Sequence, residues 1–509
     1  MVPPPRARGN RGLNNPCMSV EPEAGNATAP TPAIAPGAEG IELRSIAGRI
    51  ARDGTDPRVR AAVPGFDAPF FQAGLAGYSD AAMRIIARRH GCPFCVTEAL
   101  LDRTLLAGGR GFAKADLGEL HDNIPGGPED QPLACQIMGS DPREMAASAL
   151  KAVEQSARGD KPYRALAYAT PGRHPTTHAR QHLRLPGGEQ IEPFDPTEGL
   201  GDEGCGVDGC EADGGEGESC EDAIDRINAL DGAGDGSIGG DEAFGADGAD
   251  GADPAGLEPP GAGVAAGGRA FATIDVNLAC PVKKIKVKAR GGHWLAEPEG
   301  AIAIMRAVRD AVPASVPCTV KLRRSFDDTP GMARNASRIL DAAADLGYAW
   351  ATVHARTVVQ KYVGPSRWDL LREIVRRHPR LPILGSGDVW NAWDIVRMIG
   401  YTGVSAAAVA RGCIGNPWIF RQAREILAGR DPRPPTIAEQ RSVLLEHFSI
   451  LLAVNRGMRH GEEATSKMMR KFGIRFAAHH PRVDDVRRRF IQVRSRDEWL
   501  AVVRDEYAG

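Results

Sequence analysis

The sequence predicts an α/β protein: a (β/α)8 TIM barrel followed by a small C-terminal helical domain. Three observations lead to this fold class. Short β-branched runs alternate with segments of helical periodicity from Phe66 onward, eight such runs are present, and the alternation stops after Phe420. Without the insertion at 156–270, residues 66–420 leave about 240 residues for the barrel, close to the ~250 typical of this fold.

Each expected strand is a short apolar run bounded by turn residues. In chain order the strands are expected at Pro69–Ala73, Phe94–Thr97, Leu133–Ile137, Ala272–Val276, Cys318–Leu322, Ala351–His354, Pro382–Leu384 and Val404–Val409. Amphipathic helices are expected between them, for example over residues 79–91, 141–157 and 335–347. Asp141-Pro142 and Gly347 are typical start and stop signals of such helices.

The insertion at 156–270 differs sharply in composition from the rest of the chain. Residues 201–255 contain 17 acidic residues, 15 glycines and a single arginine, whereas the whole chain has a net charge of only -2. Because such a segment can build little core, we expect a surface excursion. The remainder is therefore basic, which suits a polyanionic partner. An alternative is that the acidic segment only tunes solubility.

The two ends of the chain have different characters. Residues 1–40 are rich in Pro, Ala and Gly and are expected to be disordered. Residues 421–509 contain 18 Lys and Arg against 12 Asp and Glu, which predicts a basic helical domain. No apolar stretch reaches signal-peptide or membrane-spanning length, and the ten cysteines follow no regular framework. We therefore expect a cytoplasmic protein with free thiols and no membrane partner.

Residues 231–242, inside the acidic insertion, resemble an EF-hand calcium loop. Asp231, Asp235, Gly236 and Glu242 fall at positions 1, 5, 6 and 12 of that pattern, although Ala233 stands where a ligand is expected at position 3. The predicted calcium ligands are Asp231, Asp235, Ser237 and Glu242. The alternative is a chance match in a segment rich in Gly and Asp.

Polar and glycine residues stand at the carboxyl ends of the expected strands, where chemistry collects in such barrels. Together with the apolar neighbours Leu75, Ala76 and Ala410, these candidate residues are Gly74, Gln136, Asn277, Cys280, Lys321, His354, Ser386, Gly387, Asp388 and Arg411. Glycine-rich loops after the last two strands are where this fold holds a phosphate. Lys321 could place positive charge beside a flavin ring. Each residue alone could be structural, but agreement among five strand ends favours a phosphorylated cofactor.

Seven motifs in order resemble those of the tRNA-dihydrouridine synthases, flavin enzymes that reduce selected uridines in tRNA. They are FQAGLAGYSDAAMR, CQIMGSDP, IDVNLACPVKK, VKLR, VHART, GSGDV and ARGCIGNPWIF. The resemblance implies a TIM barrel that binds FMN, with NADPH or NADH as reductant. The implied FMN-binding residues are Gly74, Leu75, Ala76, Gln136, Lys321, His354, Ser386, Gly387, Asp388, Ala410 and Arg411. It also implies Cys280 as the catalytic acid and Asn277 as a contact to the target base. Three positions depart from the family pattern: Gly74-Leu75 replaces Pro-Met, Ala279 replaces Gly, and Ser386 replaces Asn.

The chemistry of these residues suits the same reaction. A cysteine thiol is mostly protonated at neutral pH, so Cys280 can donate a proton, although a buried inert thiol is the structural alternative. The lysines that follow it, and two basic residues of the helical domain, are expected to contact tRNA phosphates. These substrate-binding candidates are Lys283, Lys284, Lys286, Arg470 and Lys471. Two other functions stay open: an FMN-dependent reductase of a small enone or pyrimidine, and a non-catalytic RNA-binding protein.

Overall fold

The computed structural model describes residues 36–102, 128–158, 183–184, 190–191, 271–281, 291–455 and 461–508. The chain divides into two compact units, residues 1–42 and 43–509, and the barrel and the C-terminal helices both belong to the second. Helices α1 (Pro36–Asp53) and α2 (Pro57–Ala62) precede the first strand. The sequence interpretation had placed the first folded residues only near Phe66.

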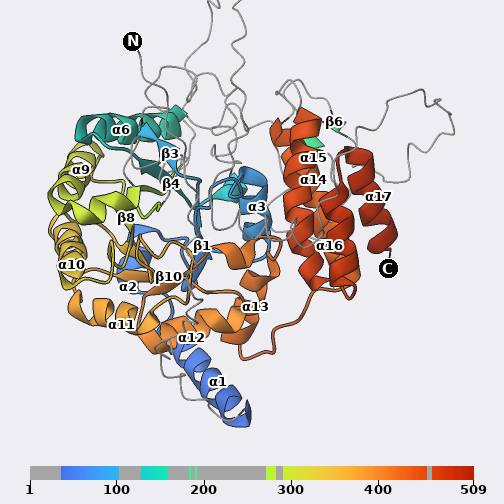
Figure 1. The fold of residues 1–509 in the computed structure, drawn as a ribbon, viewed down its shortest axis with the longest axis horizontal. Helices are drawn as coiled ribbons and strands as arrows, with labels where there is room; N and C mark the ends of the chain where they lie inside the picture. Colours follow the sequence, from blue (N-terminus) through green and yellow to red (C-terminus); the bar gives the residue numbers. More distant parts are fainter. Residues whose placement is uncertain are drawn as a thin grey trace, which may run out of the picture. The chain divides into compact units, whose positions relative to one another are not determined.

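Eight parallel strands close into a barrel, which confirms the predicted fold class (Figure 1). The hydrogen-bonded order is β1-β2-β4-β7-β8-β9-β10-β11, and β11 pairs with β1 to close the ring. The strands are β1 (Phe70–Gln72), β2 (Cys95–Val96), β4 (Leu133–Met138), β7 (Thr273–Leu278), β8 (Cys318–Arg323), β9 (Ala351–His354), β10 (Ile383–Ser386) and β11 (Ala406–Val409). Each overlaps one of the eight predicted runs. Three further short strands are β3 (Leu100–Leu101), which pairs with β4, and the antiparallel pair β5 (Leu183–Arg184) and β6 (Gln190–Ile191).

Alternation along the strands separates an inner core from an outer one. Phe71 and Leu384 belong to an inner cluster built around the stacked rings of Phe66 and Phe94, whose centroids are 5.1 Å apart. Residues one position away, such as Phe70, belong instead to the outer core shared with the helices. Side chains of a strand alternate between its two faces, and Phe71 lines the same pocket as Gln136, Asp275 and Lys321, so these polar residues point into the barrel.

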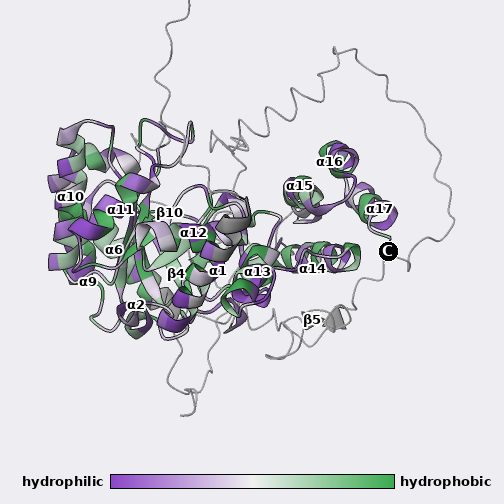
Figure 2. Cartoon of the chain, turned by 90° about the horizontal axis from the view of Figure 1, so that it is seen from below, coloured by the Kyte–Doolittle hydropathy of each residue, from purple (hydrophilic) through white to green (hydrophobic). Residues whose placement is uncertain are grey.

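Helices cover the outside of the barrel (Figure 1). They are α3 (Ala81–Arg89), α6 (Pro142–Arg158), α9 (Pro298–Ala311), α10 (Pro330–Asp345), α11 (Trp368–Arg377), α12 (Ala392–Thr402) and α13 (Trp418–Leu427). Each carries both hydrophobic and hydrophilic residues (Figure 2). In α10 the buried residues Ala336, Ile339, Leu340 and Ala343 are spaced as one face of a helix requires. Short 3-10 helices lie at η1 (Pro128–Asp130), η3 (Gly291–Ala296) and η4 (Arg411–Cys413).

The C-terminal residues form a four-helix domain. Its helices are α14 (Ile437–Asn455), α15 (Gly461–Phe476), α16 (Val483–Gln492) and α17 (Arg496–Glu506), with the 3-10 helix η5 (Ala477–His479) after α15. Trp499 is completely buried, and its ring centroid lies 4.6 Å from that of Phe448 and 6.3 Å from that of Phe490. Its indole N–H donates to the carbonyl of Met469. One tryptophan of α17 therefore joins all four helices.

Helix α15 also contacts two loops at the end of the barrel. The ring of Phe472 meets that of Tyr78 edge-on at 5.8 Å, in the loop after β1. In the loop after β11, a Cβ placed on Gly415 would lie 2.6 Å from Cβ of Arg475, so that loop lies directly against the helix. Within the described ranges no helix is both long and apolar enough to span a membrane.

Candidate active site

The strand ends bring the predicted site residues together at one end of the barrel. Gln136 ends the inward face of β4 and is in register with Asp275 of β7. Asn277, two residues further along β7, is in register with Lys321 of β8. On the other side of the barrel, His354 is in register with Ser386 at the ends of β9 and β10. Parallel register thus places these predicted residues on adjacent strands.

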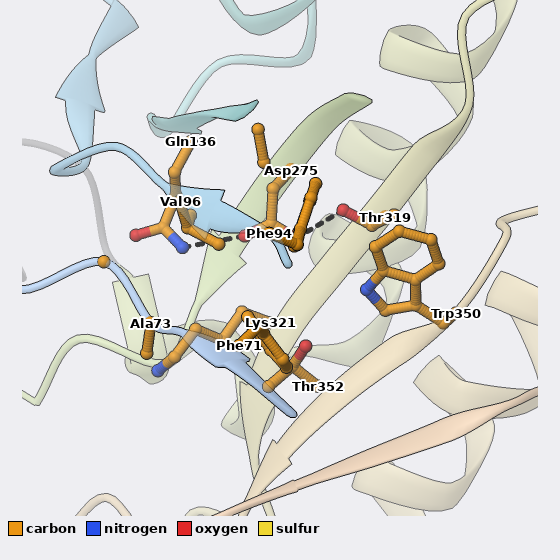
Figure 3. Close-up of a pocket in the computed structure, with 12 residues that line it drawn as sticks. Phe71, Ala73, Phe94, Val96, Gln136, Asp275, Thr319, Lys321, Trp350 and Thr352 are labelled. Carbon is orange, nitrogen blue, oxygen red and sulfur yellow. Dashed lines mark hydrogen bonds between the residues drawn. The ribbon is translucent and has the colours of Figure 1, made fainter. Parts of the chain in front are cut away.

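A continuous chain of hydrogen bonds links three of the strands. Asn277 Nδ2 donates to Gln136 Oε1 at 2.7 Å, and Gln136 Nε2 donates to Asp275 Oδ2 at 2.7 Å. Thr319 Oγ1 donates to the other carboxylate oxygen of Asp275 at 2.6 Å (Figure 3). All four side chains are buried. Burial raises the pKa of Asp275, and the two donors oppose that rise because they stabilise the carboxylate.

Lys321 lies beside this chain and lines a pocket inside the barrel (Figure 3). Its ammonium has no hydrogen-bond partner among the residues that the structure describes. Burial, together with the nearby Arg323 guanidinium, lowers its pKa to about 8, while Asp275 and Cys280 act in the opposite direction. Lys321 is half-buried at this end of the barrel, and a cation removed from much of its water is more stable when a ligand supplies negative charge. Lys321 is therefore suited to an anionic or electron-rich ligand.

His354 is held as a neutral ring. Its Nδ1 accepts the backbone N–H of Arg356 at 3.2 Å, so the proton of the neutral tautomer lies on Nε2. Burial lowers the pKa of His354 well below its ordinary value, and the surrounding cations Arg323, Lys321, Arg356 and Arg411 lower it further. The ring therefore offers a hydrogen-bond donor rather than a charge.

The loop after β10 is shaped by an ion pair. Both carboxylate oxygens of Asp388 accept from Arg356 Nη2 at 2.8 Å, and Oδ2 also accepts the backbone N–H of Ser366. Gly387 has a φ of 116°, and a Cβ there would lie 2.3 Å from Ser366 Oγ, so only glycine fits. The side chain of Asp388 thus faces Arg356, and any contact of this residue with a cofactor would come from its backbone.

The loop after β1 is closely packed. A Cβ on Gly74 would lie 2.3 Å from the carbonyl oxygen of Thr97, which explains glycine where the resemblance leads one to expect proline. The backbone N–H of Leu75 donates to Ser79 Oγ at 2.7 Å, and Ser79 Oγ donates back to the Leu75 carbonyl. Ala76 lies within the same turn. These bonds fix the loop but occupy the Leu75 amide.

Cys280 follows β7 and is partly buried. Arg323 Nε donates to the carbonyl of Ala279 at 3.0 Å, and Arg323 Nη1 donates to the carbonyl of Thr357. The carbonyl of Cys280 accepts the N–H of Gly292 at 2.8 Å. Cys280 is also close enough to oppose the lowering of the pKa values of Lys321 and Arg323. The backbone before and at Cys280 is therefore held by hydrogen bonds, and the residue lies near the cations Lys321 and Arg323.

Ala410 and Arg411 follow β11. Ala410 precedes the short helix η4, and the Cys413 amide donates to its carbonyl. The guanidinium of Arg411 lies 3.9 Å from Asp388, 5.2 Å from the ring of Tyr362 and 4.8 Å from the ring of Trp390. Ser386, at the end of β10, is buried, and its carbonyl accepts the N–H of Ala355.

Several predicted residues lie elsewhere. Lys283, Lys284 and Lys286, and the calcium-loop candidates Asp231, Asp235, Ser237 and Glu242, are outside the described residues. Among those that are described, no group of acidic, His or Cys side chains could hold a metal. Arg470 donates to the carbonyl of Val493 at 3.5 Å, and the Lys471 ammonium lies 5.9 Å from the ring centre of Tyr78. Both side chains therefore have partners inside the protein.

The residues at the barrel end fit an FMN cofactor. The partnerless Lys321 ammonium and the Nε2–H of His354 provide a cation and a donor for the polar edge of a flavin ring. Gly387 and the cation Arg411 stand at the loops where this fold holds a phosphate. The fit rests on unpaired polar groups of the protein rather than on the pattern of the sequence alone.

A family model described as dihydrouridine synthase (Dus) matches residues 253–507, which include β7 and every later element. The chain belongs to the dihydrouridine synthase family. A probable tRNA-dihydrouridine synthase of Treponema pallidum is 31% identical over 238 residues, 46% of this chain and 68% of the relative. A probable tRNA-dihydrouridine synthase of Mycobacterium tuberculosis is 31% identical over 228 residues, 44% of this chain and 56% of the relative.

Another member of the family, tRNA-dihydrouridine synthase B of Shewanella oneidensis, is 34% identical over 208 residues, 41% of this chain and 59% of the relative. The chain thus spans little more than half the length of most of these dihydrouridine synthase relatives. Family membership agrees with the resemblance inferred from the seven motifs.

The sequence interpretation missed three residues that support the site: Asp275, Thr319 and Arg323. A signal for them was present, because Asp275 stands two positions before Asn277 and Thr319 and Arg323 flank Lys321 at the same spacing. Side chains two apart on a strand share a face. Polar residues at that spacing in a buried strand indicate an inward polar network. In this member of the dihydrouridine synthase family, the network joins β4, β7 and β8 inside the barrel.

Proposed function

We propose that the protein is a tRNA-dihydrouridine synthase, which reduces the 5,6 double bond of specific uridines in tRNA with FMN and NADPH or NADH. Family membership and the names of the relatives support this proposal. The observation that carries it is the proximity of Cys280, which follows β7, to Lys321 on the neighbouring strand β8. A proton donor and a cation then share one site.

Cys280 is the proposed acid. Bound FMN would supply the hydride that goes to C6 of the uracil ring. The Sγ–H of Cys280 would deliver a proton to C5, and general acid catalysis of this kind contributes about 10²- to 10⁴-fold. Arg323 holds the carbonyl of Ala279, directly before the thiol, and so fixes the direction in which Cys280 points.

Asn277 is proposed to orient the base. Its Oδ1 accepts the N–H of Ala279 at 2.9 Å, and one Nδ2 hydrogen is given to Gln136. The second N–H of Nδ2 can donate a hydrogen bond to a uracil carbonyl. Because both amide atoms are already tied to the protein, the side chain would be oriented before the base arrives.

Lys321 and His354 are proposed to hold the flavin, with the backbone of Gly74, Leu75, Ala76, Ser386, Gly387, Asp388 and Ala410, the amide of Gln136 and the cation of Arg411. Lys283, Lys284, Lys286, Arg470 and Lys471 remain the proposed contacts to tRNA phosphates. For Arg470 and Lys471 this role requires that the side chains leave their present internal partners.

One experiment tests the proposed function. The purified protein, reconstituted with FMN, is mixed with NADPH under anaerobic conditions and its visible spectrum is followed. Unmodified tRNA is then added, and dihydrouridine is mapped by sequencing. Bleaching by NADPH, followed by return of the flavin bands on addition of tRNA and formation of dihydrouridine, is the expected result. A protein that takes up no FMN, or reduces free uracil but not tRNA, would contradict it.

A further inference from the structure

A stack of alternating cations and aromatic rings runs along the mouth of the barrel. The guanidinium of Arg323, which holds the loop before Cys280, lies 5.4 Å from the ring centre of Tyr362. Arg411 lies 5.2 Å from the same ring and 4.8 Å from that of Trp390. The stack therefore connects the catalytic loop to Trp390, the fourth residue after Ser386 at the end of β10.

Trp390 ends the stack in solvent. Its relative exposure is 48%, although Arg411 covers part of the indole. The loop that carries Tyr362 also exposes two apolar side chains, Val359 at 62% and Val363 at 77%. Large apolar side chains that stay exposed beside a functional site are typical of a binding surface.

The charge beside Trp390 favours an anionic ligand. Asp388 is the acidic partner of Arg411, but it lies at 3.9 Å and gives both oxygens to Arg356 at 2.8 Å. One carboxylate therefore serves two arginines. Asp394, which accepts the backbone N–H of Trp390, forms an ion pair with Arg397, so Arg356 and Arg411 still leave a surplus of positive charge. An aromatic face next to a guanidinium matches the base and the phosphate of a nucleotide.

We propose that Trp390 is a stacking platform for an unpaired nucleotide of the RNA that flanks the base entering the site. This proposal rests on the proposed function and adds a specific RNA contact to it. A nicotinamide dinucleotide has the same chemistry, but a small ligand needs a concave site that buries most of its surface. A side chain as exposed as Trp390 suits a polymer that is anchored elsewhere as well.

The test compares Trp390→Ala and Trp390→Phe with Tyr401→Ala. Tyr401 is a matched control because it is 47% exposed and lies 5.3 Å from the guanidinium of Arg372. It stands at the end of α12, after which the chain enters β11 from its amino end, so it is remote from the mouth. Each FMN-loaded variant is titrated with unmodified tRNA at several salt concentrations, and affinities are compared at the same salt concentration.

Loss of one stacked base weakens binding roughly 5- to 150-fold. We expect this loss in Trp390→Ala, a smaller one in Trp390→Phe and less than twofold in Tyr401→Ala. The slope of affinity against salt should not change in Trp390→Ala, because no phosphate contact is removed. The rate of flavin reduction by NADPH, measured without tRNA, should also be unchanged.

Three results would overturn the platform. Equal tRNA affinity in Trp390→Ala and wild type is the first. A raised KM for NADPH with unchanged tRNA affinity would assign the surface to the reductant, and loss of FMN with unchanged tRNA affinity would assign it to the cofactor. If wild-type protein itself neither binds nor reduces tRNA, the proposed function has failed, and that outcome is distinct from a failure confined to Trp390.

Discussion

Asn277 Nδ2 donates a hydrogen bond to Gln136 Oε1 at 2.7 Å, which joins the ends of β7 and β4. The two residues are 141 positions apart in the chain, on either side of the insertion. Since Asn277 immediately precedes Leu278, Ala279 and Cys280, the bond fixes the start of the loop that carries Cys280 to a strand on the other side of that insertion. The long insertion is therefore compatible with an ordered site.

Replacing Gln136 should destabilise the protein. Gln136→Met keeps the size of the side chain but leaves Asp275 Oδ2 and Asn277 Nδ2 without their partners. At ~1–3 kcal/mol for each buried polar atom left unsatisfied, we expect a loss of about 2–5 kcal/mol in the free energy of unfolding by urea. Thr319→Val, which removes one donor, should cost about half as much. An equal loss of unfolding free energy in Gln136→Met and Thr319→Val would contradict the view that Gln136 makes two of these hydrogen bonds and Thr319 only one.

Replacing Cys280 should separate the two halves of the reaction. In Cys280→Ala, flavin reduction by NADPH should proceed at the wild-type rate, because no proton reaches uracil in that step. Formation of dihydrouridine in tRNA should fall by about 10²-fold or more. Cys318→Ala, at a buried cysteine of the adjacent strand, is the control and should retain activity. Full activity in Cys280→Ala would remove Cys280 from its proposed role.

The ionisation of Lys321 should control FMN binding. The pKa of Lys321 is about 8, and only the protonated form attracts an electron-rich ligand. FMN affinity of the wild type should therefore fall above pH 8, by up to about tenfold per pH unit. In Lys321→Met the affinity should be low and independent of pH between 7 and 9. Fluorescence titration of FMN at each pH measures both, and a flat wild-type profile would contradict the assignment.

The same lysine should change the stability of the FMN-free protein with pH. Its folded pKa of about 8 lies below the value of 10.5 for an exposed lysine, so between these values the unfolded chain binds more protons. The free energy of unfolding should therefore rise with pH across that window in the wild type. Lys321→Met should lack this rise, and urea unfolding at pH 7.5 and 9.5 compares the two proteins.

Gly74 and Gly77 should respond differently to alanine. At Gly74 a Cβ meets the carbonyl oxygen of Thr97 at 2.3 Å, so the backbone must move. A Cβ placed on Gly77 would meet none of the described residues within 4 Å, and only the φ of 72° is unfavourable, at ~1–2 kcal/mol. We expect Gly74→Ala to weaken FMN binding strongly and Gly77→Ala to keep it, measured by titration. The reverse order would place the cofactor away from the loop after β1.

The strands and the strand-end residues could be predicted because they depend on local pattern. Runs such as Ala351–His354 are β-branched and end in a polar residue, and parallel strands bring such ends together. The side chains that these residues contact could not be predicted from the sequence. That Asp388 faces Arg356, 32 positions away, and that Lys471 lies over Tyr78 depend on loop conformation and on packing between domains. No periodicity in the sequence encodes either contact.

The lysines after Cys280 and the calcium loop at 231–242 stay predictions, since they lie outside the described residues. The exposure of Trp390 also could not be predicted from the sequence, because a tryptophan after a buried strand is more often part of the core. Its exposure became visible only with the positions of Arg411 and Tyr362.

The contact of α15 with Gly415 and Tyr78 has a consequence for biosynthesis. A ribosome completes all eight strands before it reaches Phe472 and Arg475, so a nascent barrel emerges with its first and last loops unsupported. Trp418, completely buried in the finished protein, also lacks the ring of Phe476, which lies 5.6 Å away. We therefore expect that synthesis of α15, rather than of the last strand, completes this end of the barrel, and that a chain truncated near residue 430 is insoluble.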